Sequence, residues 1–254
     1  SIIGSFLNVV ILRLPNGQKL NGRSRCPSCK NKLATIDLFP LVSYLFLLGK
    51  CRHCGYKISP RYFVIEFVTG ILFAFAWWHI QPVQLAGYIL LLKYFFIVAT
   101  LVVVFTIDLE HFIILDSVIF SSFVVVMLLN LTLDMVGKSA IFSISGNFIG
   151  GAVAALAAAF PFFIVWYFSS GNWMGFGDVK LALFLGTALG LGGVFIGLMV
   201  AVLLGGTVSA FLLMLTSKTL KSRLPFGTFL SLGAILSLFY GEKILNWYLY
   251  FLGF

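Results

Sequence analysis

Long apolar runs, separated by short polar segments, occupy most of the 254-residue chain. A run of about 18 or more apolar residues is long enough to cross a bilayer as a helix. The pattern predicts an all-α polytopic membrane protein with about eight transmembrane helices. The predicted spans are 1–13, 62–80, 85–107, 112–133, 147–168, 179–192, 194–216 and 227–252.

The first and the sixth predicted spans are shorter than the others. The chain begins with Ser1 in apolar sequence, so we expect the first helix to be clipped at its start, and no charged leader of a signal peptide precedes it. The span 179–192 is short and rich in glycine. A tight turn at residues 190–193 would pair it closely with the next span. The alternative is that residues 179–192 and 194–216 form one bent helix plus a short stub.

Composition excludes a water-soluble domain, since 61% of residues are hydrophobic, 10% are charged and the mean hydropathy is +1.08. The formal net charge of +9 would indicate nucleic acid binding in a soluble protein. Here, ten of the 17 Lys and Arg residues lie between Arg13 and Arg61. The positive-inside rule places this segment on the cytoplasmic side, with 108–111, 169–178 and 217–226 as the other inner loops. We expect the lipid bilayer, and no nucleic acid, as a partner.

The predicted domain organisation follows from these spans. Residues 1–13 form the first transmembrane helix, 14–61 a small cytoplasmic domain inserted after it, and 62–254 a transmembrane bundle. No linker of low complexity and no clear internal repeat divides the chain further.

The inserted segment contains all four cysteines of the chain in two C-x-x-C pairs separated by 21 residues. They are Cys26, Cys29, Cys51 and Cys54. Two such turns place four thiolates at the corners of a tetrahedron, which suits a structural Zn²⁺ with no open coordination position. Disulfides or free thiols are the alternative, which a reducing cytoplasm disfavours.

Acidic residues are rare, with eight in the chain, and most lie near the predicted inner ends of spans. Asp108 closes one apolar run, and Asp178 opens another in the sequence G-F-G-D. Two carboxylates that share a proton can activate water and protonate a carbonyl, as in aspartic proteases. Gly175 and Gly177 would allow unusual backbone dihedrals beside Asp178 and let a substrate chain approach. The alternative is that each acid is a solvated helix end or cap.

Six motifs occur in a fixed order along the chain. They are G-S-F-L-N-V-V-I-L-R-L-P at 4–15, the paired cysteine knuckles, S-P-R-Y-F-V-I-E at 59–66, D-L-E-H-F-I-I-L-D at 108–116, G-F-G-D-V-K-L at 175–181 and P-F-G-T-F-L at 225–230. Together they resemble the bacterial type IV prepilin peptidases, the leader peptidase/N-methyltransferase family of G-x-G-D aspartic membrane proteases. The resemblance covers nearly the whole chain.

The resemblance implies an inner-membrane endopeptidase that removes the basic leader of prepilins and pseudopilins after a glycine, on the cytoplasmic side. It implies that Asp108 and Asp178 are the catalytic pair and that the cysteine segment binds zinc. It also implies N-methylation of the new N-terminus with S-adenosylmethionine, although no residues for that cofactor are predicted. The residues expected to support the site are Gly175, Gly177, Glu110, Asp116, Lys180 and Glu66.

Glu66 has two interpretations: a part of the methyltransferase or leader-binding site, or a buried acid paired with Arg61 or Lys180. Three positions depart from the family pattern. Leu115 precedes Asp116 where proline is usual, Phe63 follows Arg61-Tyr62 in place of proline, and Thr228 ends P-F-G-T in place of proline. None of them removes a carboxylate.

Two other functions remain open at this stage. Intramembrane acids also mark proton-coupled transporters. However, the key acids lie at one face, and we find no broken helices in matching halves. A zinc-regulated scaffold would explain the cysteines but not G-F-G-D. The prepilins that are cleaved and the oligomeric state are not predicted.

Overall fold

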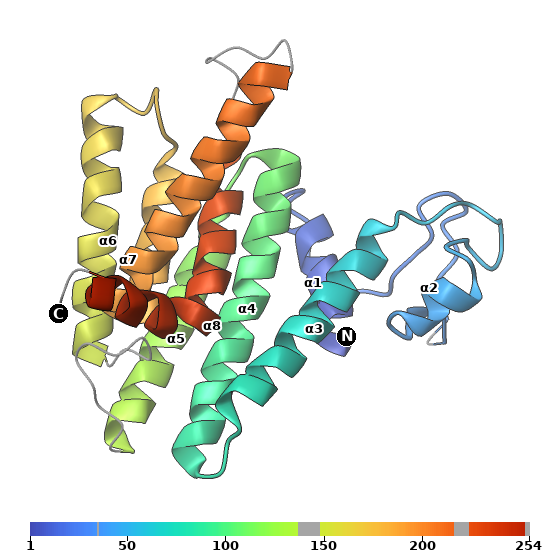
Figure 1. Cartoon of the computed structure of the whole chain (residues 1–254). Coiled ribbons are helices and arrows are strands. Elements are labelled where there is room, and N and C mark those ends of the chain that lie inside the picture. Colours follow the sequence, from blue (N-terminus) through green and yellow to red (C-terminus); the bar gives the residue numbers. More distant parts are fainter. Residues whose placement is uncertain (35, 137–147, 216–223, 252–254) are drawn as a thin grey trace. The chain divides into compact units, whose positions relative to one another are not determined.

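The computed structural model of the chain describes residues 1–34, 36–136, 148–215 and 224–251 (Figure 1). In these residues the protein is all-helical, apart from two isolated β-bridges. The chain divides into two compact units, Ser1–Phe75 and Ala76–Phe254. Most of the predicted inner loop 217–226 lies outside the described residues, as does Lys138.

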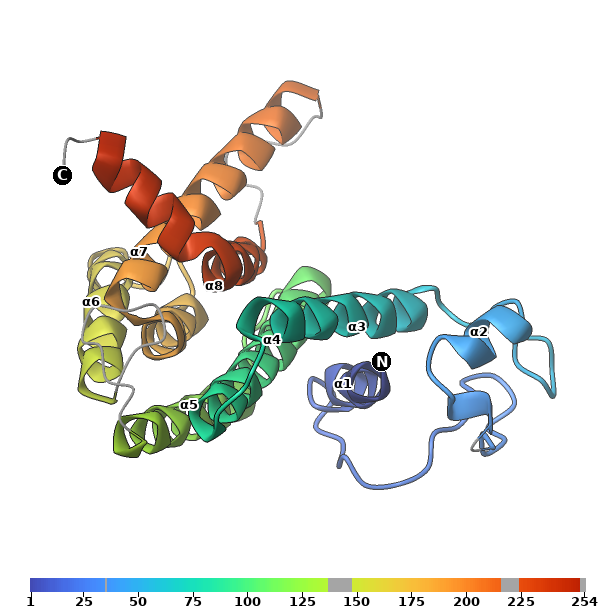
Figure 2. The same ribbon diagram turned by 60° about the horizontal axis from the view of Figure 1, so that its bottom comes forward.

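The first unit pairs α1 (Ile2–Arg13) with most of α3 (Arg61–Ile80), as Figure 2 shows. The helices approach so closely that a Cβ on Gly4 would lie 2.8 Å from the Glu66 Cα. Asn8 on α1 also donates a 3.1 Å hydrogen bond to the Tyr62 carbonyl on α3. Between them the chain forms two cysteine turns, the 3₁₀ helix η1 (Ile36–Leu38) and the short helix α2 (Val42–Phe46).

The second unit is a helical bundle. It consists of α4 (Leu85–His111), α5 (Asp116–Met135), α6 (Phe148–Phe168), α7 (Phe176–Leu215) and α8 (Phe226–Phe251). α7 packs against α5, α6 and α8, while α4 packs against α5 and α8. Small residues allow this close packing, since a Cβ on Gly186 of α7 would overlap the Ala154 carbonyl of α6.

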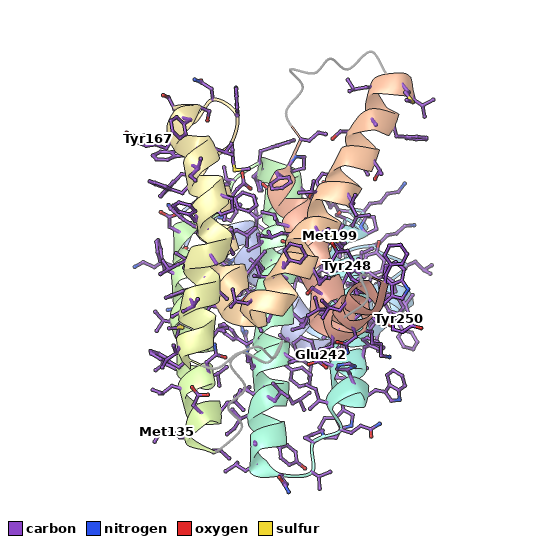
Figure 3. The ribbon with its side chains drawn as sticks, turned by 60° about the vertical axis from the view of Figure 1, so that its left-hand side comes forward. Met135, Tyr167, Met199, Glu242, Tyr248 and Tyr250 are labelled. Carbon is purple, nitrogen blue, oxygen red and sulfur yellow. The ribbon has the colours of Figure 1, made fainter. Side chains whose placement is uncertain are left out.

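Six of the described helices, α3 to α8, are long and apolar enough to cross a membrane, and α1 is a shorter apolar helix. Their outer faces expose large apolar side chains. Figure 3 shows Tyr167 and Tyr250, 65% and 83% exposed, projecting outward from the helices. The chain is therefore a multi-pass membrane protein, as predicted. The boundary that differs most is that of α5, which begins at Asp116 instead of residue 112 because α4 continues to His111.

The sixth and seventh predicted spans form one element, α7, which is broken at Gly190 (φ 71°, ψ 178°). This dihedral pair is open to glycine and strained for other residues. The first arm, residues 176–189, is about 21 Å long, shorter than the bilayer core of about 30 Å. In Figure 1 both ends of α7 point toward the same end of the second unit. The predicted turn at residues 190–193 is thus present as a break at Gly190.

Side chains from neighbouring helices satisfy carbonyls beside this break. A helix that stops at residue 189 leaves its last carbonyls without intrahelical partners. Asn130 on α5, fully buried, donates a 3.1 Å hydrogen bond to the Thr187 carbonyl. In an apolar medium such an unpaired carbonyl is costly, so the Asn130 bond stabilises the broken helix. Ser237 on α8 donates a 2.5 Å bond to the Gly193 carbonyl, in the first turn of the second arm, and so ties this arm to α8.

Candidate active site and metal centre

Asp108 lies in the last turn of α4, and its residue is only 5% exposed. Its Oδ2 accepts a 2.8 Å hydrogen bond from the backbone N–H of Thr228, the third residue of α8. The Gly227 N–H also points to this carboxylate. The first N–H groups of a helix have no intrahelical partner and favour a negative charge. The start of α8 therefore holds Asp108 in place.

Asp178 lies in the first turn of α7, directly after the turn that ends at Gly175. Its backbone N–H donates a 3.2 Å bond to the Gly175 carbonyl, and the Gly175 N–H lies near its carboxylate. The turn before α7 therefore holds Asp178 at the helix start. Asp178 is partly exposed and lies close enough to Asp108 for direct charge–charge repulsion. The two predicted carboxylates are thus brought together from different helices.

Ile114, in the α4–α5 connection, lies between the two carboxylate-bearing turns. A Cβ on Gly177 would lie 3.0 Å from the Ile114 Cβ, and a Cβ on Gly227 would lie 3.0 Å from the Ile114 Cδ1. A Cβ on Gly227 would also come within 2.8 Å of Asp108 Oδ2. Both glycines therefore allow close packing around the acids.

The expected unusual dihedrals beside Asp178 are absent. Neither Gly175 nor Gly177 has a positive φ angle. Gly177 is already helical, and it is needed because Ile114 leaves no room for a side chain. Gly175 has more space, since its nearest neighbour would be Asp178 Oδ2 at 3.9 Å. Gly175 is also exposed, so nothing in the described residues covers this turn.

The other predicted acids have separate partners. Asp116, at the start of α5, forms a 2.6 Å ion pair with Lys180. Glu110 lies 3.9 Å from the imidazole of His111. Glu66 lies in the first unit, where it accepts a 2.9 Å hydrogen bond from the backbone N–H of Leu41. Lys180, one of the two partners that the sequence offered for Glu66, forms its ion pair with Asp116.

Three residues of this site were not singled out from the sequence: Ile114, Gly227 and Thr228. The motif P-F-G-T contains the last two, but only as part of a resemblance. Thr228 contacts Asp108 across 120 residues of sequence, and Ile114 meets Gly177 and Gly227 across 63 and 113, so no local pattern reveals these roles. One feature of the sequence indicates Gly227 and Thr228: P-F-G-T comes just before an apolar run. Such a position marks the start of a helix, where the backbone N–H groups have no intrahelical partner.

The four cysteines converge as predicted. Their Sγ atoms all lie within 4.8 Å of one another, and those of Cys26 and Cys54 are 3.8 Å apart. Four sulfurs at about 2.3 Å from a tetrahedral Zn²⁺ are about 3.8 Å from each other. The donor set and spacing could therefore hold a metal ion, and all four thiols are free in the structure.

The two cysteine turns share one backbone design. The Lys30 N–H bonds to the Cys26 carbonyl, and the Gly55 N–H bonds to the Cys51 carbonyl in the same way. In each turn the residue after the second cysteine has a positive φ angle, 60° and 68°. The backbone N–H of Cys29 directed at the Cys26 sulfur lowers the pKa of that thiol to about 6. Burial and the neighbouring cysteine sulfurs raise the pKa of Cys29 to about 11, so this turn favours one thiolate, that of Cys26.

Comparisons with known proteins cover both units. Residues 1–80 match the Bacterial Peptidase A24 N-terminal domain, and residues 95–210 match the Type IV leader peptidase family. No solved structure matches the chain.

Several curated proteins named Prepilin leader peptidase/N-methyltransferase are similar to the chain. One from Vibrio cholerae is 34% identical over 199 residues, covering 75% of this chain and 74% of the relative. Those from Pseudomonas aeruginosa and Bacillus subtilis are both 28% identical, covering 100% and 98% of this chain and 92% and 94% of theirs. On these matches, which run through both the cysteine turns and the paired aspartates, the chain belongs to the type IV leader peptidase family.

Proposed function

We propose that the protein is an aspartic endopeptidase that removes the basic leader of type IV prepilins and pseudopilins after a glycine. Asp108 and Asp178 are the catalytic pair in this proposal. The observation that carries it is the meeting of these two carboxylates, from the end of α4 and the start of α7, beside the N-terminus of α8. Membership of the peptidase family supports the same reaction.

In the proposed reaction the pair shares one proton. The ionised carboxylate takes a proton from water as the water oxygen attacks the glycine carbonyl carbon, and the protonated carboxyl donates to the carbonyl oxygen. Collapse of the tetrahedral intermediate breaks the C–N bond: the carboxyl that took the water proton donates it to the leaving amine, and the other carboxylate takes back the proton of the former carbonyl oxygen. The Thr228 N–H keeps Asp108 in position throughout this cycle.

The substrate has a basic leader followed by an apolar helix. We place the active site at the cytoplasmic face of the bacterial inner membrane, where the positive-inside rule locates the basic segment 13–61. Glu110 and the catalytic pair supply negative charge for the leader. Asp116 contributes less negative charge for binding the leader than expected, because it already forms an ion pair with Lys180.

We further propose that the protein methylates the amine released by cleavage. When bound, S-adenosylmethionine supplies an electrophilic methyl group, and the protein has to hold the amine neutral and in line with it. The names of the relatives support this second activity. The four cysteines in this proposal hold a structural Zn²⁺, since four thiolates leave no position for a substrate.

Cleavage of a model prepilin with a Gly-Phe junction tests the peptidase activity directly. We expect the parent to cleave it, while Asp108→Asn and Asp178→Asn each lose about a thousandfold or more, in the range of acid–base catalysis. Glu242→Gln, an exposed acid on α8, is the matched control and should cleave normally. Cleavage by either aspartate variant at close to the parent rate, or no cleavage by the folded parent, would contradict the proposal.

The alternative function, a proton-coupled transporter, has no support in the described residues. The two acids lie in terminal turns of their helices, and the single broken helix, α7, has no counterpart in the described part of the first unit. The relatives are named as peptidases and methyltransferases.

A further inference from the structure

A patch of large apolar side chains lies exposed on the first unit, in the segment between the two cysteine turns. Its five members are each between 60% and 85% exposed: Ile36, Phe39, Leu45, Phe46 and Leu48. They lie in η1, in α2 and in the residues that directly follow these two helices. The segment is too short to cross a bilayer. Exposed apolar patches of this kind mark surfaces that contact a partner protein or a membrane.

The position of α2 places this apolar patch at the level of the membrane surface. Glu66, in the second turn of α3, accepts a 2.9 Å hydrogen bond from the backbone N–H of Leu41, directly before α2. The ring centroids of Tyr44 on α2 and Phe63 in the first turn of α3 are 5.5 Å apart. The 20 residues of α3 extend about 30 Å, which equals the bilayer core of about 30 Å. The start of α3, and α2 beside it, therefore lie where acyl chains meet headgroups.

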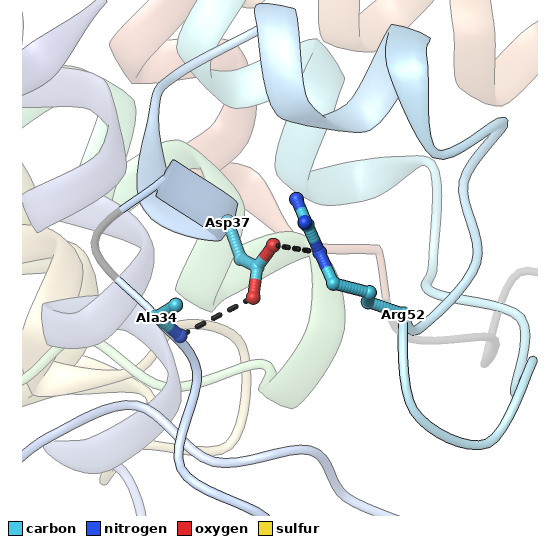
Figure 4. A network of polar contacts seen from close by, with 3 residues as sticks. All are labelled: Ala34, Asp37 and Arg52. Atoms are coloured by element: carbon cyan, nitrogen blue, oxygen red, sulfur yellow. Dashed lines mark hydrogen bonds and ion pairs between the residues drawn. The ribbon is translucent and has the colours of Figure 1, made fainter.

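The segment that contains the apolar patch also carries the positive charge of the chain. Residues 13–61 hold ten of the 17 Lys and Arg residues but one of the eight acids, so the rest of the chain is formally neutral. That acid is Asp37, whose side chain is only 4% exposed and pairs with Arg52 at 2.8 Å. It also accepts a hydrogen bond from the Ala34 N–H (Figure 4). No carboxylate of this segment is therefore exposed beside its Lys and Arg side chains.

Each cysteine turn sets two of these cations opposite each other. Isolated antiparallel bridges pair Arg25 with Lys32 around the first turn and Lys50 with Lys57 around the second. Like charges directly opposite each other on neighbouring strands are destabilising. Even with Zn²⁺ bound, four thiolates leave two negative charges against these four cations. An additional anion beside the turns would therefore stabilise both pairs, and a phosphate group is such an anion.

We propose that the apolar patch inserts into the inner leaflet of the membrane and that the paired cations bind the headgroups of anionic phospholipids. Apolar side chains beside basic ones are the composition that binds such a surface. The basic leader of a prepilin fits it poorly, because the leader carries the same charge. The contact holds the cysteine turns against the membrane, in addition to their connections to α1 and α3. The inference does not depend on the peptidase or the methyltransferase activity.

Photocrosslinking in nanodiscs tests the insertion on the full chain. Photoreactive benzoylphenylalanine replaces Phe46 or Leu48 in the apolar patch or, as the control, Ser28, an exposed residue of the first cysteine turn. The nanodiscs contain equal parts of phosphatidylglycerol and phosphatidylcholine with the same acyl chains, and mass spectrometry identifies the adducts. We expect at least about fivefold more lipid adducts at the two patch positions than at Ser28. Melting temperatures show whether each variant is folded.

Several results of this experiment would overturn the insertion. Adducts at the apolar patch with peptides beyond residue 76 of the same chain, in place of lipid, would mean that the second unit covers the patch. Adducts between two chains would mean that a second copy covers it. Equal yields of lipid adducts at the patch and at Ser28 would mean that nearness to the disc, and not insertion, produces them. The absence of any adduct at the patch would mean that it faces water.

The adducts at position 46 also test the choice of headgroup, because the two lipids differ only there. We expect phosphatidylglycerol in at least about twofold excess over phosphatidylcholine, and nearly equal shares when Lys50→Gln and Lys57→Gln are combined. Lys243→Gln, in the second unit, removes one positive charge elsewhere and should keep the excess. Metal content and melting temperature show whether the cysteine turns remain folded. Equal shares without the lysine substitutions, or an unchanged excess with them, would overturn the assignment of anionic headgroups.

Discussion

The backbone N–H of Thr228 donates a 2.8 Å hydrogen bond to Asp108 Oδ2, joining positions 120 residues apart. Thr228 is the third residue of α8, so its N–H has no partner within the helix. Asp108 is therefore oriented by the first turn of α8, a helix that contributes neither of the paired acids. This makes P-F-G-T a part of the active site in our proposal.

Removing this N–H should leave both cleavage and α8 intact, because proline is usual at this position in the family. Proline lacks the donor and is tolerated in the first turn of a helix. The Gly227 N–H remains near Asp108, so we expect Thr228→Pro to keep kcat/KM within about threefold of the parent. Thr228→Ala keeps the N–H and loses the same hydroxyl bond to Pro225, so it is the matched control. A clear loss of cleavage in Thr228→Pro but not in Thr228→Ala would show that the Thr228 N–H is required.

Gly227 should be intolerant of even one added methyl group. In Gly227→Ala the Cβ would lie 2.8 Å from Asp108 Oδ2 and 3.0 Å from the Ile114 Cδ1, so Asp108 would have to move. Cleavage should fall about tenfold or more, while binding of a prepilin peptide changes less.

Gly206→Ala, in α7, is the control for this substitution because no heavy atom lies within 4 Å of the added Cβ. It should cleave normally and unfold at a slightly higher temperature, since alanine favours helix by roughly 0.5–1 kcal/mol. Normal cleavage by Gly227→Ala would mean that the packing around Asp108 is looser than the distances indicate.

The sequence predicted the helices well because hydrophobic runs and glycine breaks are local signals. The break at Gly190 and the four-cysteine cluster both follow from spacing along the chain. The partners of the acids did not follow, since Lys180 reaches Asp116 over 64 residues and Thr228 reaches Asp108 over 120. Such contacts depend on how the helices pack. The sequence alone offers each of these residues several possible partners and does not show which one lies nearby.

Asn130 should matter for both stability and cleavage. Its side chain satisfies the Thr187 carbonyl beside the Gly190 break, at the far end of the arm that carries Asp178 in its first turn. Asn130→Leu leaves a buried carbonyl unpaired, which costs about 1–3 kcal/mol. We expect a lower melting temperature and a reduced kcat with little change in KM. The reason is that the substitution displaces the Asp178 carboxylate and leaves the surface that binds the substrate in place.

Thr132→Val is a suitable control on the same helix, because the Thr132 hydroxyl is exposed and bonds only to its own helix. It should keep both melting temperature and kcat. A loss of stability without a change in kcat in Asn130→Leu would limit Asn130 to a structural role.

The cysteine centre should bind one zinc ion per chain and release it in acid. Protons compete with the metal for the thiolates, so occupancy falls as the pH is lowered. The pKa of Cys26 is lowered from 9.0 to about 6 by the Cys29 N–H. In the metal-free domain this thiolate therefore contributes stability fully above about pH 9 and loses it as the pH falls through about 6. Mass spectrometry of bound metal between about pH 8 and pH 5, with melting curves at each step, measures both effects. Cys51→Ser should abolish the zinc signal and lower the melting temperature as chelation does, whereas chelator-resistant stability with no metal at neutral pH would favour disulfides.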